Sequence, residues 1–281
     1  MASKSDYAPE EVKACKSVLV ELIHLFGEIK DEMVIIGGWT PALLFPQSVE
    51  PHIGSLDIDV ALNFAKIPND TYQTILKSFL KRGYVQDKEQ PFRFYRTVAL
   101  EGMESVKVAV DLMAGEYGGT GKSRRTQSVQ DARARKARGC DLAFNSTITV
   151  TIEEELPGGG MDKVSVKVAG IVPFLVMKGM AMHERLKEKD AYDIYFCLEH
   201  YAGGVDALVR EFKPHLKNKL VMEGLGKIRS RFATMKHVGP VWVADFMEKS
   251  NKEEREILMR RVYEKVTDML DALKIKEWAG K

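Results

Sequence analysis

The hydrophobic pattern of the chain changes near residue 170, and this change limits the folds that it can adopt. Before that point, short apolar runs and alternating stretches indicate β-strands. The expected strands lie near Met33–Ile36, Leu56–Leu62, Phe92–Leu100, Val106–Met113, Thr147–Glu153 and Val164–Val168. From Val172 almost to the end, the pattern is helical. We therefore expect an α/β (α+β) fold, with a mixed-sheet core over residues 1–170 and a helical C-terminal region over residues 171–281.

Two helices are expected within the core region. Residues 9–29 begin with a proline and two glutamates and then carry apolar residues at helical spacing, which predicts an amphipathic helix. A second helix is expected from about Asn69 to Lys81. Glycines 37 and 38 end the first strand, and the glycine-rich stretch at residues 156–160 predicts a turn between the last two strands.

The composition is that of an ordinary globular protein of 281 residues, 45% hydrophobic and 29% charged. No apolar run approaches the ~20 residues needed to span a bilayer, so no membrane association is expected. The polar stretch Met1–Lys16 predicts that there is no secretory signal. The three cysteines are few and widely spaced, which favours a reducing, cytoplasmic location over a disulfide framework.

Positive charge is concentrated in one segment. Lys122–Arg138 holds seven basic residues and one acid, a net charge of +6, while the whole chain has a net charge of +2. The other 264 residues therefore sum to −4. The segment indicates a bound anion, such as a triphosphate or a nucleic-acid backbone; the alternative is the solvated face of a helix, since Arg133, Lys136 and Arg138 need no partner.

Carboxylates interrupt two otherwise apolar strands. Asp57 and Asp59 alternate with apolar residues, so they point to the same side, roughly 7 Å apart along the strand. Asp111 interrupts a later strand in the same way. Unpaired charge is costly in such strands, and oxygen ligands suit hard cations such as Mg²⁺, or Mn²⁺. At Gly37–Gly38, the absence of side chains would let backbone amides approach a phosphate.

These residues resemble those of a known family. Gly37–Gly38 followed by Ser55–Asp59 is similar to the signature of the polymerase-β-like nucleotidyltransferase superfamily. Phe174–Lys178, then Arg185 and Lys189–Asp193, resembles the later motif of its AbiEii-type branch. That branch includes the toxins of type IV and related toxin–antitoxin systems.

The resemblance implies a nucleotidyltransferase core in which Asp57 and Asp59 bind Mg²⁺. Asp111 would complete the metal site or activate the acceptor. Gly37, Gly38 and Ser55 would contribute to nucleotide binding.

In the later motif, the resemblance implies that Lys178 meets the phosphates of the nucleotide and that Asp190 and Asp193 form its paired acids. Independently of the family, Lys178 and Arg185 are seven residues apart and are expected on one helical face, where they could neutralise a pyrophosphate leaving group. The two aspartates, spaced i, i+3, could hold those cations. Asp190 could equally be an acidic cap of a helix over Ala191–His200.

The expected reaction is attack of an acceptor hydroxyl on the α-phosphate of a nucleoside triphosphate, with release of pyrophosphate. The resemblance and the basic segment Lys122–Arg138 point to RNA or tRNA as acceptor, and the resemblance also raises the possibility of a toxin with a cognate antitoxin. Two alternatives remain: a small-molecule, aminoglycoside-like acceptor, or a catalytically silent module that binds a nucleotide or a protein. The glycine-rich stretch Gly115–Ser123 is not expected to be a P-loop, because five residues rather than four separate its first glycine from the Gly-Lys pair.

Overall fold

The computed structural model describes residues 2–67, 76–100, 102, 104–116, 126–129 and 132–280. Its fold is α/β, as expected from the sequence. The chain divides into two compact units. The sheet unit consists of Tyr7–Leu44 and Ile53–Gly170, and the helical unit consists of Met1–Asp6, Phe45–His52 and Ile171–Lys281. The pattern change near residue 170 falls at the main division, but it does not reveal that two earlier segments belong with the C-terminal helices.

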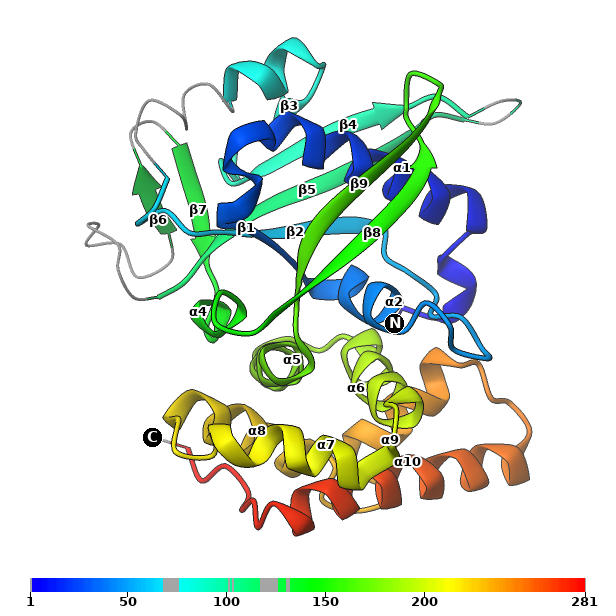
Figure 1. The fold of residues 1–281 in the computed structure, drawn as a ribbon. Helices are drawn as coiled ribbons and strands as arrows, with labels where there is room; N and C mark the ends of the chain where they lie inside the picture. The colour runs from blue at the N-terminus through cyan, green and yellow to red at the C-terminus, as the bar shows by residue number, and fades with distance from the viewer. Residues whose placement is uncertain are drawn as a thin grey trace. The chain divides into compact units, whose positions relative to one another are not determined.

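The strands described in the sheet unit form one mixed sheet (Figure 1). They are β1 (Met33–Ile36), β2 (Asp57–Leu62), β3 (Val85–Gln86), β4 (Arg93–Val98), β5 (Val106–Ala114), β6 (Thr126–Val129), β7 (Ala132–Lys136), β8 (Thr147–Glu155) and β9 (Met161–Ala169). Their order is β3-β4-β5-β2-β1-β9-β8, and the hairpin β6–β7 joins through pairing of β7 with β5. In the centre of the sheet, β2 runs parallel to β5 and antiparallel to β1.

All six strands expected from the sequence are present, with ends that differ by a few residues. Three strands were not expected. β3 has only two residues, too few to produce a pattern. Both β6 and β7 lie in the basic segment: β6 has only four residues, and in β7 alanine rather than a β-branched residue alternates with arginine. The helix-face interpretation of that segment is therefore wrong, because Arg133 and Lys136 lie in a strand and Arg138 follows it.

The first expected helix is confirmed as α1 (Pro9–Phe26), which buries one face in the core of the sheet unit. It ends at Gly27, whose φ of 48° suits glycine. Shorter helices are α2 (Thr40–Leu44), α4 (Cys140–Ala143), and 3₁₀ turns at Gly27–Glu32 and Gly37–Trp39. Of the helix expected over residues 69–81, residues 76–81 are helical, and residues 69–75 lie outside the described residues.

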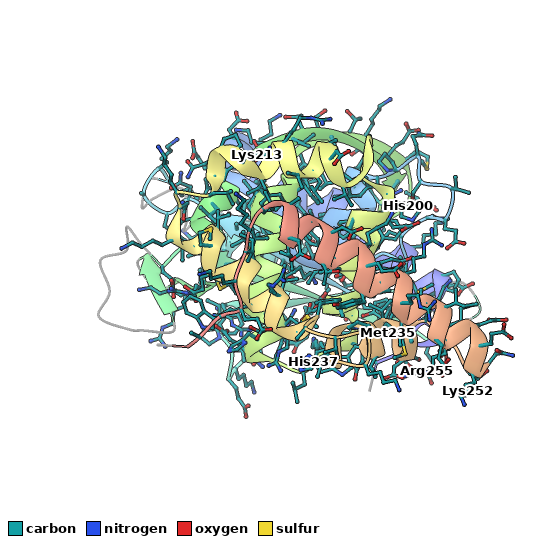
Figure 2. The ribbon with its side chains drawn as sticks, turned by 90° about the horizontal axis from the view of Figure 1, so that it is seen from below. His200, Lys213, Met235, His237, Lys252 and Arg255 are labelled. Atoms are coloured by element: carbon teal, nitrogen blue, oxygen red, sulfur yellow. The ribbon has the colours of Figure 1, made fainter. Side chains whose placement is uncertain are left out.

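The expected helical C-terminal region is confirmed. Its helices are α5 (Ile171–Glu184), α6 (Glu188–His200), α7 (Gly204–Phe212), α8 (Lys219–Arg231), α9 (Val238–Phe246) and α10 (Lys252–Ala272). Gly179 and Gly224 allow α5 and α8 to approach closely, since a β-carbon on either would meet the other helix's backbone. Figure 2 shows Lys252 and Arg255 at one end of α10, and Arg255 joins α10 to α9 by a 2.6 Å ion pair with Asp245. Within the described part of the chain, none of the helices combines the length and the apolar character needed to cross a membrane.

Candidate functional site

The three carboxylates predicted from the sequence share one region of the sheet. Asp57 and Asp59 are two residues apart on β2, so their side chains point to the same face. In the parallel pairing of β2 with β5, Asp59 is in register with Asp111. Asp57 and Asp59 are partly exposed, whereas Asp111 is buried. The pairing of these two central strands therefore brings together acids that are more than 50 residues apart in sequence.

The glycine turn lies directly against this acidic face. Ile36, the last residue of β1, is paired with Asp59 on β2, and Gly37 follows with a φ of 71°. A β-carbon at Gly37 would overlap the carboxylate of Asp59. Position 37 thus requires glycine for two reasons: its backbone is left-handed, and the carboxylate of Asp59 occupies the space of a side chain.

Gly38 follows in the same 3₁₀ turn and is buried. The helix after this turn, α2, has only five residues. The contribution of a helix dipole to phosphate binding at this turn is therefore small.

A serine holds one of the two partly exposed acids. The hydroxyl of Ser55 donates to Oδ1 of Asp57 at 2.7 Å, and Ser55 itself is buried. Because the hydroxyl approaches from just before the strand, it fixes the orientation of the carboxylate at the start of β2. Ser55 was expected near the nucleotide, and the structure gives it a contact with the acidic face.

The buried acid of this group is paired with an arginine that sequence reasoning missed. Arg93 on β4 is in register with Asp111, and its Nε and Nη2 donate to the two carboxylate oxygens at 2.7 and 2.6 Å. This bidentate bond raises the pKa of the Arg93 guanidinium. A buried acid in a strand signals that a cation lies nearby, but only strand pairing identifies Arg93 as that cation.

No group of three or more His, Cys, Asp or Glu side chains arranged to hold a metal ion is found among the described residues. The candidate metal ligands are thus two partly exposed carboxylates, with Asp111 beside them and engaged by Arg93. Mg²⁺ is commonly bound through one or two carboxylates and completed by substrate phosphates and water. Asp57 and Asp59 fit that requirement, and the role of Asp111 as a further ligand stays a prediction.

The later motif forms a compact ion-pair cluster inside the helical unit. Nζ of Lys178 on α5 lies 2.8 Å from Oδ1 of Asp190 and 2.6 Å from Oδ2 of Asp193. Arg185 donates twice to Asp190, at 3.0 and 3.1 Å, and Lys189 donates to Asp193 at 2.9 Å. The interpretation that the two aspartates hold nearby cations thus describes the observed contacts. Both acids lie within the first two turns of α6, which begins earlier than expected.

Arg185 differs from the other members of this cluster. It closes the last turn of α5, where its N–H donates to the carbonyl of Ala181 at 2.8 Å, and both Lys178 and Arg185 meet Asp190. The side chain of Arg185 is 45% exposed, whereas that of Lys178 is 7% exposed. The guanidinium of Arg185 is therefore more open to solvent than the ammonium group of Lys178.

Charges in this cluster stabilise one another against the cost of burial. Burial alone would raise the pKa of Asp193, but Lys178, Lys189 and His52 hold it far below its usual value. Burial would likewise lower the pKa of Lys178, yet Asp190 and Asp193 raise it. Lys178, Asp190 and Asp193 are consequently charged at neutral pH.

His52 is a member of the cluster for which the sequence gives no signal. Its Nε2 lies 2.9 Å from Oδ1 of Asp193, and its ring stacks on Tyr192 with centroids 5.3 Å apart. Burial is the main cause that lowers the pKa of His52 to about 4. At neutral pH the ring is neutral, and since Asp193 can only accept, we infer that Nε2 carries the proton and donates it.

The described part of the basic segment lies beside the acidic strand. β7 pairs in parallel with the end of β5, at Met113 and Ala114, two residues after Asp111. Arg133 and Arg135 alternate with the buried Ala134 and are exposed. The guanidinium of Arg135 lies over the ring of Phe92, 6.0 Å from its centroid. Arg138 forms a 2.8 Å ion pair with Glu116. Lys122, Arg124 and Arg125, like most of the rejected P-loop stretch, lie outside the described residues.

The predicted site residues thus form two groups. Those in the sheet unit are Gly37, Gly38, Ser55, Asp57, Asp59 and Asp111, and those in the helical unit are Lys178, Arg185, Asp190 and Asp193. Comparison with known proteins found no matching family model and no matching curated protein.

Proposed function

We propose that this protein is a metal-dependent nucleotidyltransferase that moves a nucleoside monophosphate from a triphosphate to an acceptor hydroxyl. The observation that supports the proposal most is the relation of three features in the sheet unit. Two partly exposed carboxylates, Asp57 and Asp59, share a face, a third acid lies in register with Asp59, and the turn at Gly37 fits against that face without a side chain.

Asp57 and Asp59 are the residues that would hold Mg²⁺ or Mn²⁺. The ion, when bound, would neutralise phosphate charge and polarise the α-phosphate. Ser55 holds the carboxylate of Asp57 in one orientation through its 2.7 Å hydrogen bond. The backbone of the Gly37–Gly38 turn would lie next to the triphosphate, because neither residue has a side chain to exclude it.

Arg93, held by Asp111, would present an oriented guanidinium next to the two metal ligands. In this pair the carboxylate of Asp111 orients the guanidinium by a bidentate bond. The side chain of Arg93 is partly exposed, so a substrate phosphate could reach it. Asp111 would bind metal or accept a proton from the acceptor hydroxyl only if Arg93 moved away.

In the helical unit, Arg185 is the cation of the buried cluster that we expect to meet phosphate. Its side chain is 45% exposed while it donates to Asp190, so a phosphate could reach the guanidinium. Lys178 and Lys189, by contrast, are buried. The role of Lys178 in nucleotide binding would then be indirect. It holds Asp190 in place, and Asp190 orients the guanidinium of Arg185.

RNA, including tRNA, is the acceptor that the charge distribution favours. Arg133 and Arg135 are exposed on β7, which pairs with the strand that carries Asp111. A row of arginines beside the reacting groups suits the phosphate backbone of a nucleic acid better than it suits a cationic aminoglycoside. A role as the toxin of a toxin–antitoxin pair is part of the same proposal, through the resemblance of the motifs. A cytoplasmic location is also part of it, on the basis of the three widely spaced cysteines.

The direct test is a transfer assay with each of the four nucleoside triphosphates, Mg²⁺ and total RNA. Parallel reactions carry radiolabel on the α-phosphate or on the γ-phosphate. We expect covalent label on RNA from the α-labelled substrate alone, because pyrophosphate would carry the γ-label away. Transfer of the γ-label would indicate a phosphotransferase instead. Absence of transfer to RNA and to aminoglycosides, together with Mg²⁺-dependent triphosphate binding, would indicate a catalytically silent module.

A further inference from the structure

Strand β8 ends the sheet, and its outer edge carries a specific pattern of backbone groups. It spans nine residues and pairs with β9 alone among the described strands (Figure 1). Hydrogen bonds between Leu156 and Gly160, and between Gly170 and Ser146, identify which residues of β8 bond to β9. In the antiparallel register these are the even-numbered residues. The N–H and C=O groups of the odd-numbered residues, from Thr147 to Glu155, therefore point outward.

The second half of this edge is already occupied. The ammonium group of Lys16 on α1 donates to the outward carbonyl of Glu153 at 3.2 Å. The N–H of Glu155 donates to the carboxylate of Glu154. Lys13 also forms an ion pair with Glu155 at 3.6 Å. Side chains thus block the edge from Glu153 onward, in the way that natural proteins protect an edge strand.

Nothing in the described part of the chain protects the first half of the edge in this way. Thr147, Thr149 and Thr151 are exposed, and no hydrogen bond to their outward backbone groups occurs among the residues that the structure describes. The segment Thr147–Thr151 contains no charged residue and no proline, and its Ile148 side chain is 50% exposed. A regular, uncharged edge of this kind is a template for another strand.

We propose that Thr147–Thr151 pairs with the same segment of a second copy of this chain, in an antiparallel arrangement centred on Thr149. The two sheets would then become continuous across a twofold axis. This inference is independent of the proposed nucleotidyl transfer.

The sequence of the segment is complementary to itself in this register. Thr149 faces Thr149 of the other copy, and Thr147 faces Thr151, so each outward N–H meets an outward C=O. Ile148 faces Val150 at the closely spaced position, which brings apolar side chains together. The acidic residues Glu153–Glu155 lie beyond the paired segment. A register centred on Thr151 would instead place Glu154 opposite Ile148, so the shared axis at Thr149 is the favoured one.

The first test is the oligomeric state of the full chain, measured by sedimentation velocity over a range of protein concentrations. We expect a concentration-dependent dimer. Thr149→Pro removes the central N–H from both copies without breaking a bond to β9, and it should weaken dimerisation by about tenfold or more. Thr149→Ala is the matched control, because it alters the side chain and keeps the N–H, so its dimer should persist. Circular dichroism and thermal unfolding confirm that both variants are folded.

The second test determines which residues of the two copies face each other. Thr149→Cys should be joined to itself by a short bismaleimide linker, because both copies place this residue at the axis. Glu153→Cys, on the same edge and outside the paired segment, is the control and should not be joined. The native cysteines are buried and should not compete. A wild-type chain that is monomeric at all concentrations would overturn the proposal. A dimer that tolerates Thr149→Pro, or that is linked equally at both cysteines, would overturn it as well.

Discussion

Gly37 and Asp59 are in contact across the pairing of β1 with β2, such that a β-carbon on the glycine would overlap the carboxylate. The backbone of the turn after β1 thus leaves free the space that the carboxylate on β2 occupies. This relation explains why a glycine motif and an acidic motif some twenty residues apart belong to one site.

The substitution Gly37→Ala tests this relation. The left-handed φ of 71° and the overlap with Asp59 should lower the free energy of unfolding by about 1–3 kcal/mol and displace the carboxylate. Gly27→Ala is the matched control, because Gly27 also has a positive φ, of 48°, but open space around its β-carbon position. Both variants should be measured by denaturant unfolding and by calorimetry of Mg²⁺-dependent triphosphate binding. Binding should be lost in Gly37→Ala alone, and equal binding in the two variants would contradict the role of Gly37.

Asp193 should be essential for the stability of the helical unit. The substitution Asp193→Asn leaves Lys178 and Lys189 buried with one fewer negative charge, at a cost of about 3–5 kcal/mol. Asp206→Asn, an exposed acid in the first turn of α7, removes the same charge and should cost less than about 1 kcal/mol. Urea unfolding of the two variants measures the difference. A loss of similar size in both would show that the cluster contributes little.

The burial of His52 predicts a pH dependence of stability. Its pKa is lowered from 6.5 to about 4 in the folded chain, so the unfolded chain binds the proton first as the pH falls. The stabilising contribution is therefore complete above pH 6.5 and is lost as the pH falls towards 4, by about 3 kcal/mol in total. His52→Gln retains a donor for Asp193 and should flatten this part of the profile. An unchanged slope in the variant would exclude His52 as its source.

Arg93 and Asp111 should behave as one unit in mutagenesis. Arg93→Gln leaves the buried acid without its bidentate partner and should destabilise the protein by about 3–5 kcal/mol. Adding Asp111→Asn to that variant should recover much of the loss, because the pair is then neutral and can still form a hydrogen bond. A double-mutant cycle of unfolding free energies gives the coupling. Additive losses would contradict the pairing of these two residues.

Much of the fold could be predicted because its strands and helices carry clear hydrophobic periodicity. The face shared by Asp57 and Asp59 follows from alternation alone. By contrast, the alignment of Asp59 with Asp111 and of Asp111 with Arg93 depends on which strands pair, and strand order is a long-range property. His52 lies in a segment without periodicity, and its contact with Asp193 joins positions 141 residues apart. The hairpin β6–β7 was missed since β6 has only four residues and β7 consists of alanine, arginine and lysine, which are weak indicators of a strand.

The central claim, that Asp57 and Asp59 form the centre of a nucleotidyltransferase site, is tested most directly by the rate of α-label transfer to RNA in matched variants. Asp57→Asn and Asp59→Asn each remove one carboxylate from the face, and Asp268→Asn removes an exposed carboxylate from α10. We expect the first two variants to lose at least about a thousandfold in rate at saturating Mg²⁺ while keeping their unfolding transitions, and Asp268→Asn to match the wild type. Transfer by Asp57→Asn and Asp59→Asn at the wild-type rate would contradict the account.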